Sequence, residues 1–156
     1  MRKKFLTFGK PDIQDPEINE VIDTLKSGWL GTGPKTKLFE RKFAQYVNAK
    51  FAIALNSCTA GLHLALDVLE IGSGDEVITT PMTFPATINV IEHVGAKPVF
   101  VDIKKKTLNI DESKIESAIS KSTKAIIPVH LAGMPCEMNS ISFLAQKYNI
   151  KVIEDA

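Results

Sequence analysis

A short run of small polar residues, Asn56 to Thr59, has the composition of an anion-binding turn. It follows an apolar stretch, Phe51 to Leu55, which we predict to be a buried strand, and it leads into a helical repeat. A turn between a strand and a helix start leaves several backbone N–H groups without partners, and the helix dipole makes that end positive. These donors, with the hydroxyls of Ser57 and Thr59, suit a phosphate group.

The same turn also fits a simpler role. It matches neither the G-x-G-x-x-G pattern of dinucleotide-binding folds nor the G-x-x-x-x-G-K-[ST] pattern of P-loops. A serine or threonine that caps the start of an ordinary helix would have the same sequence. Both interpretations stay open unless other residues converge on the same place.

The composition is that of a globular chain with one good-sized core: 156 residues, 44% hydrophobic and a net charge of +1. A charge this close to zero gives no bulk attraction to nucleic acid or to an anionic membrane. No apolar run approaches the roughly 18 residues of a membrane span, and no signal-peptide core follows the basic start Met1–Lys4. Cys58 and Cys136 are too few for a disulfide framework or a zinc site, so we expect no metal and a reduced, cytoplasmic protein.

The first fifty residues predict, in order, an extended arm, a helix, a glycine-rich loop and a second helix: 5–12, Asp15–Ser27, Gly28–Pro34 and 35–47. Asp15 is expected to cap the first helix, with Pro16 at its first position. That helix carries one apolar stripe: Ile18, Val21, Ile22 and Leu25. The loop holds the only tryptophan, Trp29, so it is either an ordinary connector or a segment that faces a ligand.

From Phe51 onward, short apolar runs alternate with amphipathic helical patterns. We predict strands at about 51–56, 76–80, 97–102, 124–129 and 150–154, and helices at about 59–70, 84–94, 111–120 and 137–148. The strands are nearly continuous apolar runs, which is typical of a sheet covered on both faces. The sequence therefore predicts an α/β fold with a mostly parallel sheet, divided into residues 1–50 and 51–156.

Ligands of such sheets bind at the carboxyl ends of the strands. The segments that leave those ends are Asn56–Thr59, Pro81–Phe84, Asp102, His130–Gly133 and Glu154-Asp155. Taken singly, Phe84 fits a core position, His130 a structural histidine and Asp155 a helix cap. Their common position at one edge favours a functional site.

Six stretches, taken in order, resemble the DegT/DnrJ/StrS family of nucleotide-sugar aminotransferases, which are pyridoxal-phosphate enzymes of fold type I. They cover almost the whole chain: Ser27–Pro34, Asn56–Leu66, Gly74–Ile78, Pro81–Thr87, Pro128–Gly133 and Val152–Ala156. Any one of them would be a weak match, but six in the family's order are specific.

The resemblance implies roles for residues that match the family's motifs. Pyridoxal 5′-phosphate would be held by Ser57, Cys58, Thr59, Ala60, Phe84, His130 and Asp155. Among these, Phe84 would stack on the pyridine ring and Asp155 would pair with the pyridinium nitrogen, which keeps the ring an electron sink. The sugar substrate would lie near Trp29, Leu30, Gly31 and Thr32.

The resemblance also implies that essential parts lie beyond Ala156. The family's Schiff-base lysine and C-terminal small domain have no counterpart in these residues, so residues 51–156 read as a partial cofactor-binding domain. The chain alone is expected to be inactive. The intact protein is expected to be a homodimer that binds neither nucleic acid nor membrane.

The expected activity is transfer of an amino group from an amino acid, glutamate by family habit, to a keto-sugar linked to a nucleotide. Such sugars serve polysaccharide, lipopolysaccharide or antibiotic biosynthesis. One alternative is the family's dehydratase branch, in which a histidine replaces the lysine. Others are a non-catalytic truncated relative and a generic nucleotide-binding domain, although the latter predicts a glycine fingerprint that Asn56–Thr59 lacks.

Overall fold

The computed structural model describes residue 5 and residues 9–156, so part of the predicted arm, residues 6–8, lies outside the described residues. The chain divides into two compact units, Met1–Ala54 and Leu55–Ala156. The predicted domains, 1–50 and 51–156, remain a prediction.

The first unit contains two helices, α1 (Asp15–Ser27) and α2 (Pro34–Tyr46). The start of α1 differs from the prediction by one residue, because Gln14 is the cap and Asp15 the first helical residue. The Glu17 side chain causes this shift: its Oε2 accepts a hydrogen bond of 2.8 Å from the Gln14 amide and satisfies the N-terminal backbone. Gly28 caps the end of this helix, and its φ of 71° is a left-handed conformation that glycine adopts without strain because it has no Cβ.

The apolar stripe of α1 is helical as predicted but it is not buried. Its four side chains are between 39% and 60% exposed: Ile18, Val21, Ile22 and Leu25. The predicted helix over 35–47 is α2, and its phenylalanines Phe39 and Phe43 contact each other with ring centroids 5.9 Å apart. Neither helix contains a buried residue, so the first unit has little core of its own among its described residues.

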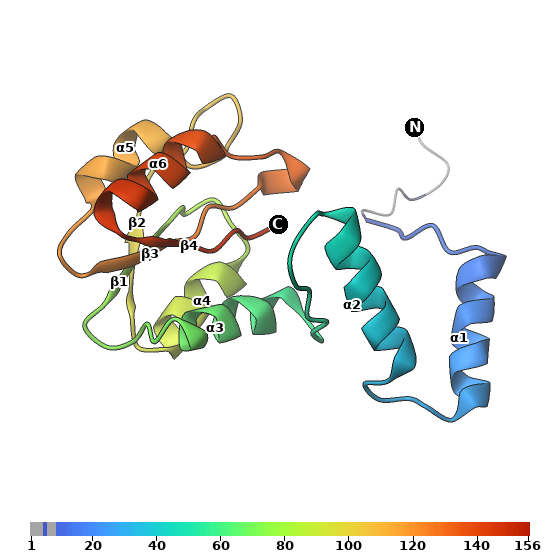
Figure 1. Cartoon of the computed structure of the whole chain (residues 1–156). Coiled ribbons are helices and arrows are strands. Elements are labelled where there is room, and N and C mark those ends of the chain that lie inside the picture. The colour runs from blue at the N-terminus through green and yellow to red at the C-terminus, as the bar shows by residue number, and fades with distance from the viewer. Residues whose placement is uncertain (1–4, 6–8) are drawn as a thin grey trace. The chain divides into compact units, whose positions relative to one another are not determined.

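The second unit is built on a four-stranded parallel sheet in the order β2-β1-β3-β4 (Figure 1). Its strands are short, and they are β1 (Glu76–Thr79), β2 (Lys97–Phe100), β3 (Thr123–Ile126) and β4 (Lys151–Val152). A parallel sheet with helical crossovers is the architecture that the alternating pattern predicts. The predicted fold class is therefore confirmed.

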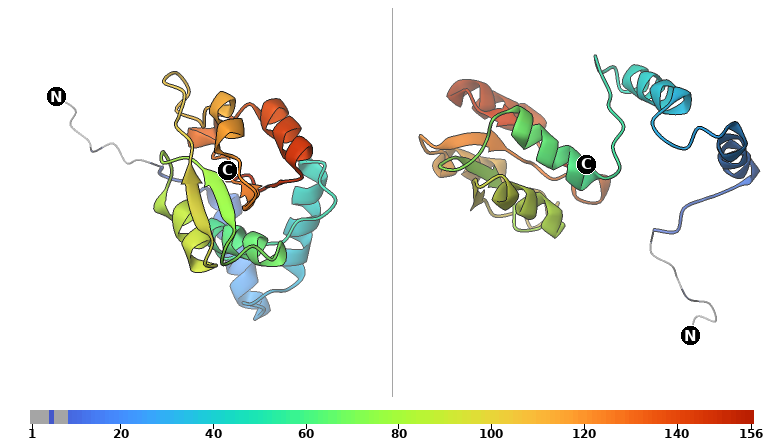
Figure 2. Two further views of the ribbon diagram at one scale, coloured as in Figure 1. Left: turned by 90° about the vertical axis from the view of Figure 1, so that its left-hand side faces the viewer. Right: turned by 90° about the horizontal axis from the view of Figure 1, so that it is seen from below.

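Two helices cover each face of the sheet (Figures 1 and 2). One face carries α3 (Cys58–Val68) and α4 (Pro85–His93), and the other carries α5 (Glu112–Ala118) and α6 (Met138–Tyr148). Successive residues of β1 point to opposite faces, as the period of a strand requires. Val77 packs with Leu66 and Ile91 under α3 and α4, whereas Ile78 packs with Ile115 and Ile141 under α5 and α6.

The predicted strand at 51–56 is wrong. These residues form no strand, and Phe51 and Ile53 are 75% and 78% exposed. An apolar run becomes a strand only when a neighbouring strand bonds its backbone, and the described residues provide none. The amide of Ala54 instead donates a hydrogen bond of 2.9 Å to the Glu40 side chain.

Candidate cofactor site

The first turn of α3 presents backbone donors at the carboxyl edge of the sheet. Ser57 caps this helix, and its Oγ accepts a hydrogen bond of 3.1 Å from the Ala60 amide. The amides of Cys58 and Thr59 precede that bond and have no acceptor among the described residues. Two N–H groups and the positive end of the helix dipole are therefore available to an anion.

Asp155 is anchored at the same edge by its backbone. It forms a parallel bridge with Val129, beyond the end of β3. Its amide donates to the Pro128 carbonyl at 3.0 Å, and its carbonyl accepts from the His130 amide at 2.9 Å. The last residues of the chain thus continue the sheet past β4, although they are shorter in regular strand than predicted.

The Asp155 carboxylate lies between the helices of one face. Its Oδ2 accepts a hydrogen bond of 2.6 Å from Thr87 Oγ1 on α4, and its Oδ1 lies 3.6 Å from Cys58 Sγ on α3. Thr87 in turn lies 2.8 Å from the hydroxyl of Thr83. The carboxylate therefore has a donor on each oxygen and lies beside the open amides of α3.

The Cys58 thiol remains protonated beside this carboxylate. Partial burial raises the pKa of Cys58, and the negative charge of Asp155 and the hydrogen bond between them raise it further. A protonated thiol can donate a hydrogen bond, whereas a thiolate would repel the carboxylate. Cys58 therefore serves here as a donor to Asp155 and not as a nucleophile.

Phe84 stands exposed at the start of α4. Its backbone is extended, with φ −69° and ψ 140°, because Pro85 disfavours a helical conformation in the residue before it. The side chain is 77% exposed although the neighbouring Thr87 is fully buried. A large aromatic ring left open at a sheet's carboxyl edge offers a flat surface for a ligand ring to stack on.

His130 follows β3 as predicted, but its ring is not brought together with Asp155. Its Nδ1 accepts a hydrogen bond of 3.1 Å from the Cys136 amide, and its Nε2 lies 2.8 Å from Glu154 Oε2. Because Nδ1 is an acceptor, the proton of the neutral ring is on Nε2 and points to Glu154. Cys136 belongs to the core under α5 and α6, so this ring lies on the opposite face from Thr87.

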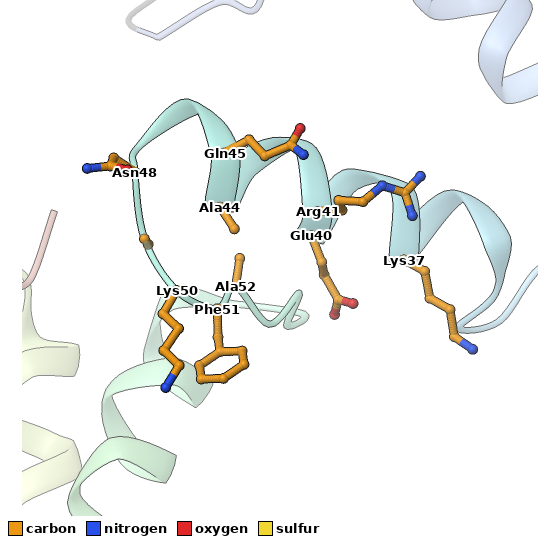
Figure 3. A pocket seen from close by; sticks show the side chains of 10 residues that line it. Lys37, Glu40, Arg41, Ala44, Gln45, Asn48, Lys50, Phe51 and Ala52 are labelled. Atoms are coloured by element: carbon orange, nitrogen blue, oxygen red, sulfur yellow. The ribbon is translucent and has the colours of Figure 1, made fainter.

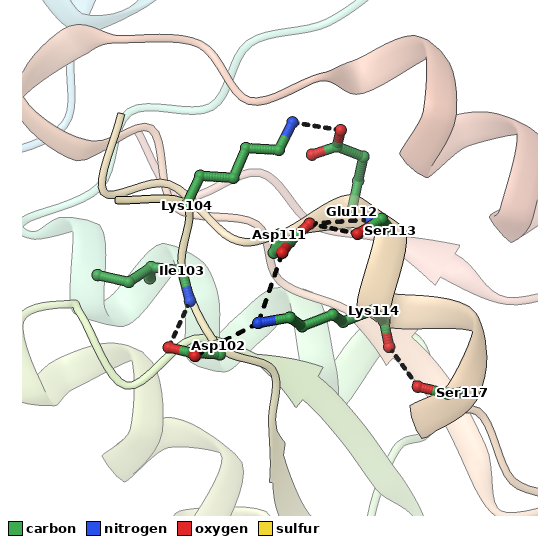
Figure 4. Close-up of polar contacts among 8 residues, drawn as sticks. All are labelled: Asp102, Ile103, Lys104, Asp111, Glu112, Ser113, Lys114 and Ser117. Atoms are coloured by element: carbon green, nitrogen blue, oxygen red, sulfur yellow. Dashed lines mark hydrogen bonds and ion pairs between the residues drawn. The ribbon is translucent and has the colours of Figure 1, made fainter. Parts of the chain in front are cut away.

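Asp102, at the end of β2, is occupied by local partners (Figure 4). Its side chain accepts from the Ile103 amide at 2.8 Å and pairs with Lys114 at 3.4 Å. The hydrogen bond from Ile103, followed by Lys114, lowers the pKa of Asp102. This carboxylate organises the turn before α5 and does not extend the site around Asp155.

Sequence reasoning missed three residues that shape the edge. Thr83 and Thr87 belong to a stretch already singled out, and their spacing of four residues places both on one side of a helix start. Asn109 is buried, and it spans the loop after β3 by donating to the Met134 carbonyl at 2.8 Å and accepting from the Leu131 amide at 3.2 Å. No local pattern marks Asn109, because both of its partners are more than twenty residues away.

The predicted sugar-binding loop belongs to the first unit and forms a small apolar pocket there. The pocket has a volume of about 430 Å³, and its lining includes Trp29, Leu30, Gly31 and Lys35. Trp29 Nε1 donates to the Thr32 carbonyl at 3.0 Å, which folds the ring back over the loop. A Cβ on Gly33 would lie 2.0 Å from this ring, so any larger residue at that position would displace the Trp29 side chain from its place over the loop.

A second groove of the first unit lies between α2 and the segment that follows it (Figure 3). It has a volume of about 580 Å³, and its charged lining residues are Lys37, Glu40, Arg41 and Lys50. The Lys50 ammonium lies 5.3 Å from the centre of the Phe51 ring, within the range of a cation–π contact. The groove holds none of the predicted site residues.

None of the described helices is long and apolar enough to cross a membrane. Nor does the described part of the chain bring together three or more histidine, cysteine or acidic side chains in an arrangement that could hold a metal ion.

Relatives of known sequence match the whole chain. An uncharacterised protein of Methanocaldococcus jannaschii is 61% identical over 156 residues, which is 100% of this chain and 40% of that protein. The spore coat polysaccharide biosynthesis protein SpsC of Bacillus subtilis is 53% identical over 155 residues, 99% of this chain and 40% of SpsC. The chain thus spans 40% of the length of both relatives.

A solved structure matches the fold at similar coverage. A Streptococcus pneumoniae protein assigned as a sugar aminotransferase, in its PMP form, superposes with a TM-score of 0.91 and 43% identity over 97% of this chain and 42% of that chain. The PLP form of the same protein has a TM-score of 0.90. The family profile of the DegT/DnrJ/EryC1/StrS aminotransferases matches residues 11–156. Profile, relatives and fold agree, and the chain belongs to the DegT/DnrJ/EryC1/StrS aminotransferase family.

Proposed function

We propose that the edge around Asp155 binds pyridoxal 5′-phosphate and that the protein transfers an amino group to a sugar. The phosphate would be held by the first turn of α3, through Ser57, Cys58, Thr59 and Ala60. The pyridine ring would stack on Phe84, and its nitrogen would face Asp155. The observation that carries the proposal is a carboxylate fixed within reach of a helix start whose amides are open.

The residues present fit this cofactor. A phosphate needs several donors in a row, and the open amides of Cys58 and Thr59 provide them. A flat ring needs an exposed apolar surface, which Phe84 offers. A protonated ring nitrogen needs a carboxylate, and Asp155 has donors on both oxygens that hold it in place.

When bound, the cofactor would supply an electron sink for cleavage of a bond next to an amino group. Asp155 would hold the proton on the ring nitrogen, because a carboxylate stabilises the positive charge there. Phe84 would hold the pyridine ring in one orientation by stacking on it, and it would shield one face of that ring from water. The helix start would anchor the phosphate and so fix the position of the ring.

Several further parts of the activity belong to this proposal. The acceptor is a keto-sugar linked to a nucleotide, the donor is an amino acid such as glutamate, and the product serves polysaccharide or other amino-sugar synthesis. The names of SpsC and of the pneumococcal neighbour support a sugar pathway. The lysine that carries the cofactor would lie beyond Ala156. The pocket around Trp29 would contact the sugar, and the working protein would be a cytoplasmic homodimer.

His130 has a more limited role in this proposal. Its ring contacts Glu154 and the Cys136 amide, so it would support the loop after β3 and would not touch the cofactor ring directly. Its backbone would act on the site through Asp155, because the His130 amide donates to the Asp155 carbonyl at 2.9 Å.

Binding of pyridoxal 5′-phosphate can be tested separately from catalysis. The protein, expressed from its full reading frame, is titrated with pyridoxal 5′-phosphate and with pyridoxal, and binding is followed by absorbance. We expect the phosphate to improve binding by at least about a hundredfold, because several charge-assisted hydrogen bonds are lost without it. Equal affinities would contradict the phosphate site at α3.

Amino transfer is then tested on the cofactor-loaded protein. Addition of L-glutamate is expected to convert the bound aldehyde form to the amine form, and a nucleotide-linked keto-sugar is expected to reverse the change and gain an amino group by mass. If the protein binds the cofactor but converts no amino acid, the proposed binding site stands and the proposed reaction is contradicted.

A further inference from the structure

Thr87 does more than fill space in the core of the second unit. It is fully buried on α4, yet its hydroxyl points to the sheet edge and donates to Asp155 Oδ2 at 2.6 Å. Its only hydroxyl proton is used in that bond, so Thr87 Oγ1 can serve Thr83 only as an acceptor. The contact of 2.8 Å between the two hydroxyls is therefore donated by Thr83.

The result is a directed chain of hydrogen bonds from Thr83 through Thr87 to Asp155. Each donor in such a chain polarises the next one, which strengthens the bond that reaches the carboxylate. The second oxygen of Asp155 is occupied from the other side by Cys58, at 3.6 Å. A carboxylate whose two oxygens are engaged by two different helices, α3 and α4, cannot rotate freely about its side-chain bonds.

We propose that Thr87 is a positioning residue, which with Thr83 fixes the Asp155 carboxylate in the orientation that the ring nitrogen of the cofactor requires. This inference rests on the proposed function for its consequence but not for its geometry. Preorganised groups gain affinity because the cost of ordering them has been met before the ligand arrives. Thr87 would thus act through Asp155, without touching the cofactor.

Cys58 provides an internal probe of this arrangement. Its thiol is exposed, whereas Cys136 is buried, so a soluble alkylating reagent reaches Cys58 first. Besides burial, the contact with the Asp155 carboxylate raises the pKa of Cys58. If the carboxylate loses its tether to Thr87 and moves, the thiol pKa falls toward its ordinary value. The pH at which Cys58 becomes half-reactive therefore reports the position of Asp155 without any cofactor.

The test compares Thr87→Val with Thr87→Ser in the full-length protein. Valine keeps the volume and removes the hydroxyl, whereas serine keeps the hydroxyl. We expect Thr87→Val to lower the pH at which alkylation of Cys58, followed by peptide mass, reaches half of its maximal rate. We also expect it to weaken the binding of pyridoxal 5′-phosphate roughly ten- to a hundredfold. Thr87→Ser should restore both values, and Thr83→Val should give a smaller change of the same sign.

Thr79→Val is the matched control. Thr79 is also fully buried and its hydroxyl also donates a hydrogen bond, but its acceptor is the Ile127 carbonyl at 2.9 Å. This variant should lower the melting temperature and leave both the thiol titration and cofactor affinity unchanged. If Thr79→Val and Thr87→Val act alike, Thr87 has only a structural role and the inference is overturned.

The two hypotheses can fail separately. If the wild-type protein does not bind pyridoxal 5′-phosphate, the proposed function fails, while the thiol titration still decides whether Thr87 holds Asp155. If the wild type binds it and Thr87→Val changes neither readout, the positioning role fails and the proposed function stands.

Discussion

Two neighbouring carboxylates, Glu154 and Asp155, follow the end of β4 and lie on opposite faces of the sheet. Asp155 turns toward α3 and α4, where its partners are the hydroxyl of Thr87 and the thiol of Cys58. Glu154 turns toward the other face, where its partner is the His130 ring. Adjacent residues of an extended chain point to opposite faces, so one step in sequence separates two different environments.

The difference between these faces shows where a ligand can bind. The polar groups of His130 are satisfied within the protein, by the Cys136 amide on one nitrogen and Glu154 on the other. The Asp155 face instead keeps two open amides and an exposed aromatic ring. A face with unused donors is suited to binding, and a face whose donors are internally paired is suited to stability.

Removing the charge of each carboxylate in turn gives the largest expected contrast. Asp155→Asn should weaken pyridoxal 5′-phosphate by more than about a hundredfold, since removing one member of a desolvated ion pair costs about 3 kcal/mol or more. Glu154→Gln should change the affinity by less than about twofold, because this carboxylate is half exposed and faces away. Similar losses from both variants would contradict the distinction between the faces.

Removing an exposed aromatic ring tests the stacking surface. Phe84→Ala should weaken pyridoxal 5′-phosphate roughly tenfold, which corresponds to about 1.4 kcal/mol, the upper range for an aromatic pair. Phe143→Ala is the control, since Phe143 is 65% exposed on α6, on the opposite face. Both variants should keep a melting temperature close to that of the wild type, because both side chains are largely exposed. An effect of Phe143→Ala equal to that of Phe84→Ala would remove the case for stacking.

Two helix caps separate stability from binding. Ser57→Ala and Asp111→Ala each remove a side chain that caps a helix, α3 or α5, and each should lower the free energy of unfolding by about 1 kcal/mol. Only Ser57→Ala should also weaken pyridoxal 5′-phosphate, because only α3 begins beside Asp155. Chemical denaturation and a cofactor titration of both variants provide the comparison.

The smallest expected effect concerns acid stability on the α5 and α6 face. Glu116 accepts hydrogen bonds of 2.7 Å from Lys147 and from Tyr148. These bonds lower the pKa of Glu116 below its ordinary value of 4.5, and the bond from Lys147 has the larger effect. Its folded pKa is depressed, so its contribution is present above pH 4.5 and is lost as the pH falls through the folded value.

Glu116→Gln should therefore flatten the fall of the melting temperature in that acid range and leave cofactor affinity unchanged. The exposed Glu70→Gln variant serves as the control, and its melting profile should follow that of the wild type. An unaltered acid profile in Glu116→Gln would show that this pairing contributes nothing to stability.

Much of the second unit could be predicted from the sequence because its strands are buried on both faces. Val77 and Ile78 are both fully buried although they point in opposite directions, and this produces the continuous apolar runs. The run from Phe51 to Leu55 looks the same in sequence but forms no strand. Pairing with a neighbour decides that outcome, and pairing is not a local property.

The site could be predicted only in outline for a related reason. The rule that ligands bind at carboxyl ends brought Phe84, Asp155 and the start of α3 to one edge. This rule does not predict on which face of the sheet each side chain lies, so the prediction placed His130 together with Asp155. It also gave no weight to Thr87, whose importance depends on a partner 68 residues further along the chain.

The protonation state of the bound ring nitrogen tests the central claim most directly. The full-length protein would be loaded with pyridoxal 5′-phosphate that is isotope-labelled at its ring nitrogen, and the nitrogen resonance read at mildly alkaline pH. A protonated nitrogen in the wild type and in Glu154→Gln, but not in Asp155→Asn, is the predicted result. An unprotonated nitrogen in the wild type, or one that is indifferent to the loss of the Asp155 charge, would contradict the assignment of Asp155 to the cofactor.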